Sequence, residues 1–383
     1  MPSRVPAMPN GRDRSSLPPM DQRRRLELVR ERIADAACEA LLVTNLVNVR
    51  YLTGFSGSAG MLLVTPDTAL FVSDGRYRDQ AAAELGAAGI DTTVEIGRAA
   101  EQLTAIDRAT KGLRRLGLEA DDITWAGQQR LASSLGCVAA GGTLVATRGV
   151  VEELRIVKDA GELARIELAA DIADIGLAQV KERLKEGLTE LQFALELDFE
   201  MRRRGADGVS FETIVASGPN GALPHHQPSD RRIAPGELVV IDFGAEVDGY
   251  RSDMTRTLCV GGVAAPELLD VLDAVLVAQR AGVRAIRPGV QTSVIDDACR
   301  DSLHHAGYGD LFVHGTGHGV GLEIHEAPAV APGSTDILAE GAVVTVEPGA
   351  YISGVGGVRI EDTLVVTATG ARALTKSTKD TIL

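Results

Sequence analysis

The sequence lacks the segments that mark membrane and secreted proteins. No apolar run approaches the ~18 residues that span a bilayer. The first twenty residues mix Arg, Pro and Ser, without the continuous apolar stretch of an ordinary secretory signal. The four cysteines form no Cys-x-x-Cys, which excludes a zinc knuckle and a thioredoxin-type redox motif. We therefore expect a cytoplasmic protein without membrane association, whose cysteines are buried thiols.

Basic charge is also scarce. In 383 residues, 39 Lys and Arg face 53 Asp and Glu, which gives a formal net charge of −14. This charge repels phosphate backbones and anionic lipids, so nucleic acid is not expected as a partner. The composition otherwise resembles that of soluble globular proteins, with 45% hydrophobic and 24% charged residues. Function must therefore be sought in local motifs.

The length suits two domains. We expect residues 1–20 to be a disordered tail, residues 21–150 an α/β domain and residues 151–383 a second domain. In the first domain, apolar segments such as 40–44 and 115–119 predict strands between Ala-rich helices. GMLLVT and ALFVS flank Pro-Asp and predict a β-hairpin. Few polar clusters in this domain suggest chemistry.

The second domain contains an internal duplication. Each half has two helices, then a loop with Gly and His, then a hairpin with acidic residues. The loops are FETIVASGPNGALPHH and LFVHGTGHGVGLEIH, and the hairpins are GELVVIDFGAEVDGYRSDMTRT and GAVVTVEPGAYISGVGGVRIEDT. The pattern predicts an α+β domain with a pseudo-twofold axis.

The two hairpins place carboxylates at equivalent points. Asp242 and Glu347 each lie six residues after a turn glycine, at the end of an apolar strand, and Asp253 and Glu361 follow in the return strands. In a single hairpin, an acidic residue near the turn is more often a turn residue or a cap than a metal ligand. Four converging carboxylates would repel one another unless divalent cations neutralised them, so the repetition points to metal. A ligand set of oxygens with one imidazole suits Mn²⁺, Co²⁺, Fe²⁺ or Zn²⁺ better than Ca²⁺.

Five of the seven histidines fall in the two loops. His304 and His305 instead end a helix, where imidazoles interact favourably with the helix dipole. For His226 and His314, a core histidine bonded to a carbonyl and a role at the site are both open interpretations. The other loop histidines are His225, His318 and His325.

Together these segments resemble the metal-dependent proline peptidases of the pita-bread fold, the aminopeptidase P and prolidase group. The matching segments are IDFGAEVDGYRSDMTRT, HGTGHGVGLEIHE, VEPGAY and GGVRIED, in the family's order, while YLTGFSGSAG and DGRYRDQA are similar to the N-terminal domain of bacterial members. The resemblance implies an α/β creatinase-like N-terminal domain and an α+β pita-bread catalytic domain. It also implies hydrolysis of the Xaa-Pro bond at the N-terminus of peptides.

The resemblance further implies two divalent metal ions per subunit, Mn²⁺ first, with Co²⁺ or Zn²⁺ as alternatives. Asp253 and Glu361 would bridge the ions, and a hydroxide shared by both would be the nucleophile. The five implied metal ligands are Asp242, Asp253, His318, Glu347 and Glu361.

Four residues would then act on the substrate. Glu347 would take the proton of the water and pass it to the leaving nitrogen. His325 would stabilise the oxyanion, and His225 would lie along the substrate. Arg359 would support the site or meet a substrate carboxylate.

Several alternatives stay open. Methionine aminopeptidase usually lacks such an N-terminal domain, creatinase lacks the metal ligands, and a non-catalytic binding protein on this fold would typically have lost some of them. An Xaa-Pro dipeptidase is the main alternative. Many dipeptidases place an Arg where this sequence has Gly333, so we expect longer peptides to be preferred. Related enzymes are commonly homodimers, and we expect a homodimer here.

Overall fold

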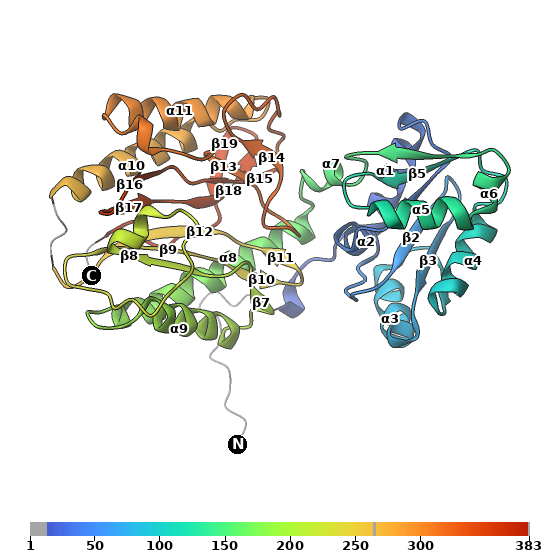
Figure 1. Ribbon diagram of the computed structural model, residues 1–383, viewed down its shortest axis with the longest axis horizontal. Coiled ribbons are helices and arrows are strands. Elements are labelled where there is room, and N and C mark those ends of the chain that lie inside the picture. The colour runs from blue at the N-terminus through green and yellow to red at the C-terminus, as the bar shows by residue number, and fades with distance from the viewer. Residues whose placement is uncertain (1–13, 263–265, 382–383) are drawn as a thin grey trace, which may run out of the picture. The chain divides into compact units, whose positions relative to one another are not determined.

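Figure 1 shows the computed structural model, which describes residues 14–262 and 266–381. The chain divides into an N-terminal unit, Met20–Arg155, and a C-terminal unit that contains Ile156–Leu383 and the segment up to Pro19. The predicted tail of residues 1–20 falls largely on residues 1–13, outside the described part. Arg14, which follows, pairs with Asp207 at 2.8 Å.

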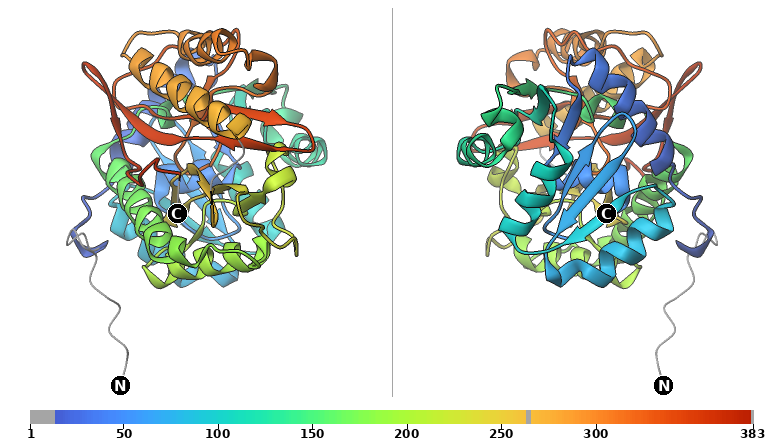
Figure 2. Two further views of the ribbon diagram at one scale, coloured as in Figure 1. Left: turned by 90° about the vertical axis from the view of Figure 1, so that its left-hand side faces the viewer. Right: turned by 90° about the vertical axis from the view of Figure 1, so that its right-hand side faces the viewer.

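The N-terminal unit is built on one mixed sheet with the strand order β4-β3-β2-β1-β5-β6. Helices flank this sheet (Figure 2). The strands are β1 (Ala40–Val43), β2 (Met61–Val64), β3 (Ala69–Ser73), β4 (Thr93–Ile96), β5 (Arg115–Glu119) and β6 (Thr143–Thr147). The helices are α1 (Gln22–Asp35), α2 (Leu46–Thr53), α3 (Arg78–Ala88), α4 (Ala99–Ala109), α5 (Trp125–Ser134), α6 (Gly136–Ala139), α7 (Glu152–Arg155) and the 3₁₀ turn η2 (Gly75–Tyr77).

The apolar segments of this unit form strands as predicted. β2 and β3 pair as an antiparallel hairpin, and β1 and β5 lie parallel in the middle of the sheet. Strand β6 is not among the strands predicted from the sequence, because the short segment TLVAT shows no alternation of apolar and polar residues; in the structure it has one buried residue. As an edge strand, β6 needs to bury less than a central one.

The C-terminal unit has two pairs of helices on opposite sides of a layer of strands. In Figure 1, α10 and α11 lie above the strands and α8 and α9 below them. The helices are α8 (Ala160–Val180), α9 (Glu190–Arg203), α10 (Pro266–Ala285), α11 (Thr292–His305), with the 3₁₀ turns η1 (Arg14–Ser16), η3 (Lys181–Arg183), η4 (Gly218–Ala222) and η5 (Gly309–Leu311).

The strands of the C-terminal unit fall into two halves. The first half has a sheet β12-β9-β8 and a small sheet β11-β10-β7, from β7 (Gly208–Val209), β8 (Ile214–Ser217), β9 (Leu238–Phe243), β10 (Ala245–Val247), β11 (Tyr250–Arg251) and β12 (Met254–Cys259). The second has a sheet β14-β13-β15-β18-β19 and the pair β16-β17, from β13 (Gly317–Gly319), β14 (Glu326–Val330), β15 (Val343–Val346), β16 (Gly349–Ile352), β17 (Gly356–Arg359), β18 (Asp362–Thr367) and β19 (Gly370–Ala373).

The halves repeat one arrangement. β9 pairs antiparallel with β12 as β15 pairs with β18, and each pair encloses a small two-stranded excursion. The residues before α9 and α11 form equivalent isolated bridges, Thr189 with Arg232 and Gln291 with Ile337. Each half also has its own apolar core, one under α8 and α9 and one under α10 and α11. The predicted duplication is therefore present in the fold.

Local sequence signals fix where the helices begin. α8 begins at Ala160, because Asp159 and Glu162 form a capping box. The Asp159 carboxylate accepts a hydrogen bond from the Glu162 amide at 2.8 Å, and the Glu162 carboxylate accepts one from the Asp159 amide at 3.0 Å. Thr189 and Gln192 form the same capping box at α9.

Three of the four cysteines are buried, and Cys38 is half-buried. Within the described residues, none of the helices has the length and apolarity needed to span a bilayer.

Candidate metal centre

The first pair of predicted metal ligands lies where β9 meets β12. Asp242 is opposite Thr255 in the ladder, and Asp253 immediately precedes β12. The two carboxylates are therefore diagonal neighbours on adjacent strands rather than a directly opposed pair. This offset still keeps them close, because diagonal positions lie within reach of each other across a β-pair.

The second pair lies at the equivalent point of the other half. Glu347 follows β15 and Glu361 precedes β18, just beyond the last paired residues of the two strands. The Glu361 amide donates to the Thr255 carbonyl at 3.2 Å, and the Thr255 hydroxyl donates to Glu361 Oε2 at 2.8 Å. The two acidic hairpins are thus joined directly to each other.

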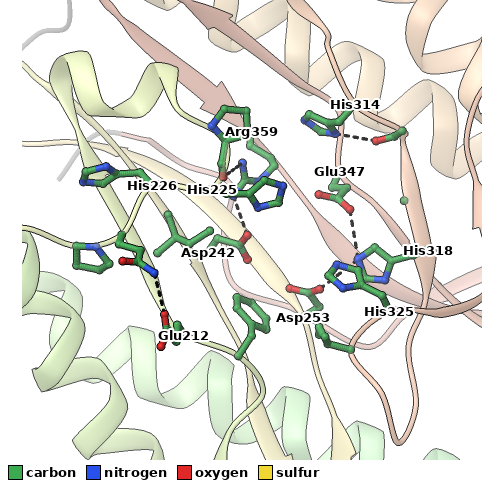
Figure 3. A pocket seen from close by; sticks show the side chains of 18 residues that line it. Glu212, His225, His226, Asp242, Asp253, His314, His318, His325, Glu347 and Arg359 are labelled. Carbon is green, nitrogen blue, oxygen red and sulfur yellow. Dashed lines mark hydrogen bonds and ion pairs between the residues drawn. The ribbon is translucent and has the colours of Figure 1, made fainter. Parts of the chain in front are cut away.

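His318 completes the group from β13. Its Nδ1 donates to the Gly319 carbonyl at 3.0 Å, and its Nε2 faces Glu347 at 3.4 Å and Asp253 at 3.6 Å. Figure 3 shows His318 turned toward both carboxylates. The glycines beside it are required, because a Cβ at Gly317 or Gly319 would collide with a carbonyl of a neighbouring strand.

The carboxylates disturb one another's ionisation. Burial, and then the neighbouring carboxylates, raise the pKa of both Asp253 and Glu361 well above their usual values. Burial alone would raise the pKa of Glu347 and lower that of His318. The hydrogen bond between these two side chains outweighs burial, so the pKa of Glu347 is lowered and that of His318 is raised. The protein's own groups therefore do not fully stabilise the ionised forms of Asp253 and Glu361.

The site fits divalent metal. Three buried carboxylate oxygens, Asp242 Oδ1, Asp253 Oδ1 and Glu361 Oε1, accept no hydrogen bond from any described residue. Potential ligand atoms of Asp253, His318 and Glu361 all lie within 4.8 Å of one another. Buried anionic oxygens without donors are rare in proteins and are the atoms that a cation would occupy. Each of these oxygens belongs to a ligand expected from the sequence.

The remaining predicted residues line a cavity of about 450 Å³ beside the carboxylates. His225 and His325 both face it, and burial, followed by the charge of His318, lowers the pKa of His325. Arg359 is buried among acceptors: it donates to Asp242 Oδ2 at 2.7 Å, to the Tyr351 hydroxyl at 2.9 Å and to the Pro224 carbonyl at 3.1 Å.

The two histidines with open interpretations are both held by hydrogen bonds at the cavity wall. His314 Nε2 lies 2.8 Å from the Tyr351 hydroxyl, and His226 Nε2 lies 2.9 Å from the Glu190 carboxylate. His304 and His305 end α11, as predicted. Gly333 does not line the cavity.

Sequence reasoning does not single out several residues that shape the site. Tyr351 is one: its ring is buried, and its hydroxyl lies 2.8 Å from His314 Nε2, 37 residues away in the sequence, so no local pattern points to it. The apolar side chains Phe211, Ile214 and Ile324 also line the cavity, and their sequence context is that of ordinary core residues.

Comparisons with known proteins agree with this geometry. The model of metallopeptidase family M24 matches residues 164–368, and that of the creatinase/prolidase N-terminal domain matches residues 25–157. The uncharacterized peptidase YqhT of Bacillus subtilis is 41% identical over 359 residues, 94% of this chain and 99% of that protein.

Solved structures give the same result. An Xaa-Pro dipeptidase from Bacillus anthracis superimposes with a TM-score of 0.89 at 38% identity, covering 94% of this chain and 100% of its own. An X-Pro aminopeptidase from Thermotoga maritima gives 0.84 at 31% identity, covering 94% and 99%. These similarities confirm the predicted fold class, and the chain belongs to metallopeptidase family M24.

Proposed function

We propose that this chain is an Xaa-Pro aminopeptidase, which hydrolyses the bond between the first residue and a following proline at a peptide N-terminus. The proposal rests on the buried carboxylate oxygens around His318 that accept no hydrogen bond from the described residues. They lie at the wall of a cavity large enough for a short peptide segment. The similar solved structures are named as peptidases of Xaa-Pro or X-Pro substrates.

Two divalent ions would be held by the carboxylates and His318. We propose Mn²⁺, because the donor set is rich in oxygen and has one imidazole. When bound, such ions lower the pKa of water and polarise a carbonyl. In this assignment Asp253 and Glu361 would be shared between the ions, Asp242 would hold one of them, and His318 with Glu347 would hold the other.

The other groups act on substrate and protons. Glu347 is the group that takes a proton from water and returns it to the proline nitrogen as that nitrogen leaves. His325 and His225, on the cavity wall, donate to the carbonyl oxygen as it gains negative charge and to the substrate backbone. Phe211, Ile214 and Ile324 offer apolar surface suited to a pyrrolidine ring.

Arg359 supports the site in this proposal rather than binding a substrate carboxylate. Its Nη1 and Nη2 already donate to Pro224, Tyr351 and Asp242, and its Nε donates to the Thr255 hydroxyl at 3.1 Å. Lysine is absent from the described cavity lining, and Arg359 is its one arginine. A free proline carboxylate would therefore meet no unengaged strong cation, whereas the amide carbonyl of a longer peptide needs none.

Gly333 gives weaker support for a preference for longer peptides than the sequence comparison with dipeptidases indicates. Gly333 is not among the residues that line the cavity. The expected preference for longer peptides therefore rests on Arg359, whose guanidinium nitrogens already donate hydrogen bonds within the protein. A dipeptidase is the second candidate, favoured by the name of the Bacillus anthracis structure.

A matched cleavage panel tests the proposal. Ala-Pro and Leu-Pro would be compared with the tripeptides Ala-Pro-Ala and Leu-Pro-Ala, and with the same tripeptides carrying Ala in place of Pro, all with Mn²⁺ supplied. We expect the highest kcat/KM for the proline tripeptides. A kcat/KM for the dipeptides at least equal to that for the tripeptides would make the enzyme a dipeptidase, and equal cleavage of the proline-free controls would refute the Xaa-Pro assignment.

Assembly and location complete the proposal. We propose a cytoplasmic homodimer: the homodimer rests on the family resemblance, and the cytoplasmic location rests on the four free cysteines, which are typical of proteins in a reducing compartment. Light scattering on the purified chain measures its mass directly, and the 40.3 kDa of a monomer at micromolar concentration would contradict the dimer.

A further inference from the structure

Glu190, which the proposed chemistry does not use, has a fully buried side chain. Its Oε1 accepts from the Ser217 amide at 2.8 Å and the Ser217 hydroxyl at 2.7 Å. Its Oε2 accepts from the Ser229 amide at 3.1 Å, the Ser229 hydroxyl at 2.6 Å and His226 Nε2 at 2.9 Å. Asn220 Nδ2 bridges both oxygens. A buried carboxylate with this many donors stays charged and rigid.

All of these donors belong to one segment. Residues 217–229 connect β8 to the approach of β9, and Ser217 and Ser229 stand at its two ends. One carboxylate therefore fixes both ends of the segment and, through Asn220 and His226, its interior. The same segment supplies five residues of the cavity wall: Pro224, His225, His226, Gln227 and Pro228.

Arg359 holds the same segment from the side of the metal centre. It donates to the Pro224 carbonyl and to Asp242, so the residue before His225 is tied to a predicted metal ligand. The segment also packs closely on β17, because a Cβ at Gly357 would collide with the Gly221 carbonyl. Figure 3 shows the result: His225 is turned toward Asp242 and Glu347, while the adjacent His226 points away from them.

Helix formation does not account for Glu190. The N-terminus of α9 is already capped by the reciprocal Thr189–Gln192 box. The Glu190 carboxylate makes none of those bonds. Its burial is therefore compensated by the loop donors, and what it organises is the wall of the cavity.

We propose that Glu190 is a positioning residue for the reaction: by anchoring residues 217–229 it directs the His226 ring outward and the His225 ring onto the substrate. The inference rests on the proposed peptidase function, because it assigns to that reaction the orientation of His225. It adds a residue about 35 positions upstream of His225, on a different element, to the groups that control turnover.

The test is a double-mutant cycle between Glu190→Gln and His225→Ala. Glutamine keeps the size of the side chain but turns an NH₂ group toward donors on one side, so the segment should detach there. Since misplacement of a reacting group by ~1 Å can lower a rate ~10²-fold, we expect Glu190→Gln to lower kcat/KM for Ala-Pro-Ala by ~10-fold or more. Metal content by elemental analysis should equal that of the parent.

The cycle distinguishes positioning from general stability. In the His225→Ala background, Glu190→Gln should lower kcat/KM by less than ~2-fold, because the group it positions is already gone. Equal losses in both backgrounds would overturn the proposal. The matched control is Glu200→Gln, a buried carboxylate on the same helix that pairs with Arg203 and Arg204 instead of the segment; its effect should be the same in both backgrounds.

A second readout needs no activity. Amide hydrogen exchange on the full chain should be faster at Ser217 and Ser229 in Glu190→Gln, and unchanged there in Glu200→Gln. If Glu190→Gln does not fold, Ser229→Ala removes one hydroxyl donor and should shift both measurements in the same direction. Unchanged exchange at both serines would overturn the anchoring role. A parent that cleaves no Xaa-Pro peptide would refute the proposed function instead, and exchange would still decide whether Glu190 holds the segment.

Discussion

Thr255 and Glu361 join the two halves of the C-terminal unit at the metal centre. The Thr255 hydroxyl donates to Glu361 Oε2 at 2.8 Å, while its own carbonyl accepts the Glu361 amide at 3.2 Å. Thr255 is also the ladder partner of Asp242 in β9. One residue of the first half therefore orients a carboxylate of the second, which predicts that the two hairpins bind metal as one unit.

Replacement of Thr255 by Val tests this connection. Valine keeps the shape but leaves Glu361 without its donor, so metal affinity should fall ~10–100-fold, as is usual when a hydrogen bond to a ligand is lost. The matched control is Thr257→Val, two residues along the same strand, whose hydroxyl donates to the Arg359 carbonyl at 2.8 Å and contacts no ligand side chain. Metal titration followed by calorimetry measures both. Equal affinities for the two variants would contradict the role of Thr255.

The ligand assignments predict different metal stoichiometries. Asp253→Ala and Glu361→Ala should each lower the occupancy of both ions, because each carboxylate is shared, whereas His318→Ala should mainly lower that of one. Elemental analysis after dialysis against limiting Mn²⁺ measures the number of ions per chain. The assignment fails if these three variants retain as much metal as the parent.

His325 and His225 are assigned to the substrate and not to metal. Replacing either by Ala should lower kcat/KM ~10²-fold, the effect typical of removing a donor to a developing oxyanion, with metal content unchanged. His304→Ala, at the end of α11, is the control and should behave like the parent. Loss of metal in His325→Ala would show that His325 is a ligand.

Glu190 also predicts an acid-sensitive contribution to stability. Burial by itself would raise the pKa of Glu190, but hydrogen bonds from Ser229, Ser217 and His226 lower it to about 2, from 4.5 for an unperturbed Glu. Since the folded pKa is the lower one, the carboxylate stabilises the fold fully above pH ~4.5 and loses this contribution as the pH falls toward 2. Arg231, which donates to the Ser217 hydroxyl at 2.7 Å, keeps its charge throughout.

The measurement is urea unfolding of the parent and of Glu190→Gln between pH 7 and pH 3. The difference in the free energy of unfolding between them should be largest near neutral pH and should shrink below pH ~4.5. A difference that stays constant down to pH 3 would mean that the Glu190 carboxylate is not held in its ionised form by the fold.

The strongly patterned parts of the fold follow from the sequence. Apolar strands bounded by turn residues, such as β2 and β3, and helices with explicit caps, such as α9 after Thr189, carry their structure in local chemistry. β6 does not, because an edge strand with one buried residue has no alternation to detect. The duplication is visible because the same acidic hairpin occurs twice.

The site residues also fall into those that the sequence reveals and those that it does not. The proposed ligand residues are recognisable in the sequence because carboxylates at the ends of apolar strands are unusual, and the structure brings Asp253, His318 and Glu361 together. Tyr351 and Glu190 are not recognisable, because their role depends on partners 37 and 36 residues away, His314 and His226. The diagonal offset of Asp242 and Asp253 depends on strand register, which a turn sequence alone does not fix.

Removing and restoring the metal tests the proposed two-metal chemistry most directly. Purified protein would be treated with chelator until elemental analysis finds no divalent metal, and hydrolysis of Ala-Pro-Ala would be measured before and after addition of Mn²⁺ or Co²⁺. A two-metal peptidase should lose its activity on chelation, and the recovery should saturate at two ions per chain. Full activity in the metal-free protein would contradict metal-dependent hydrolysis.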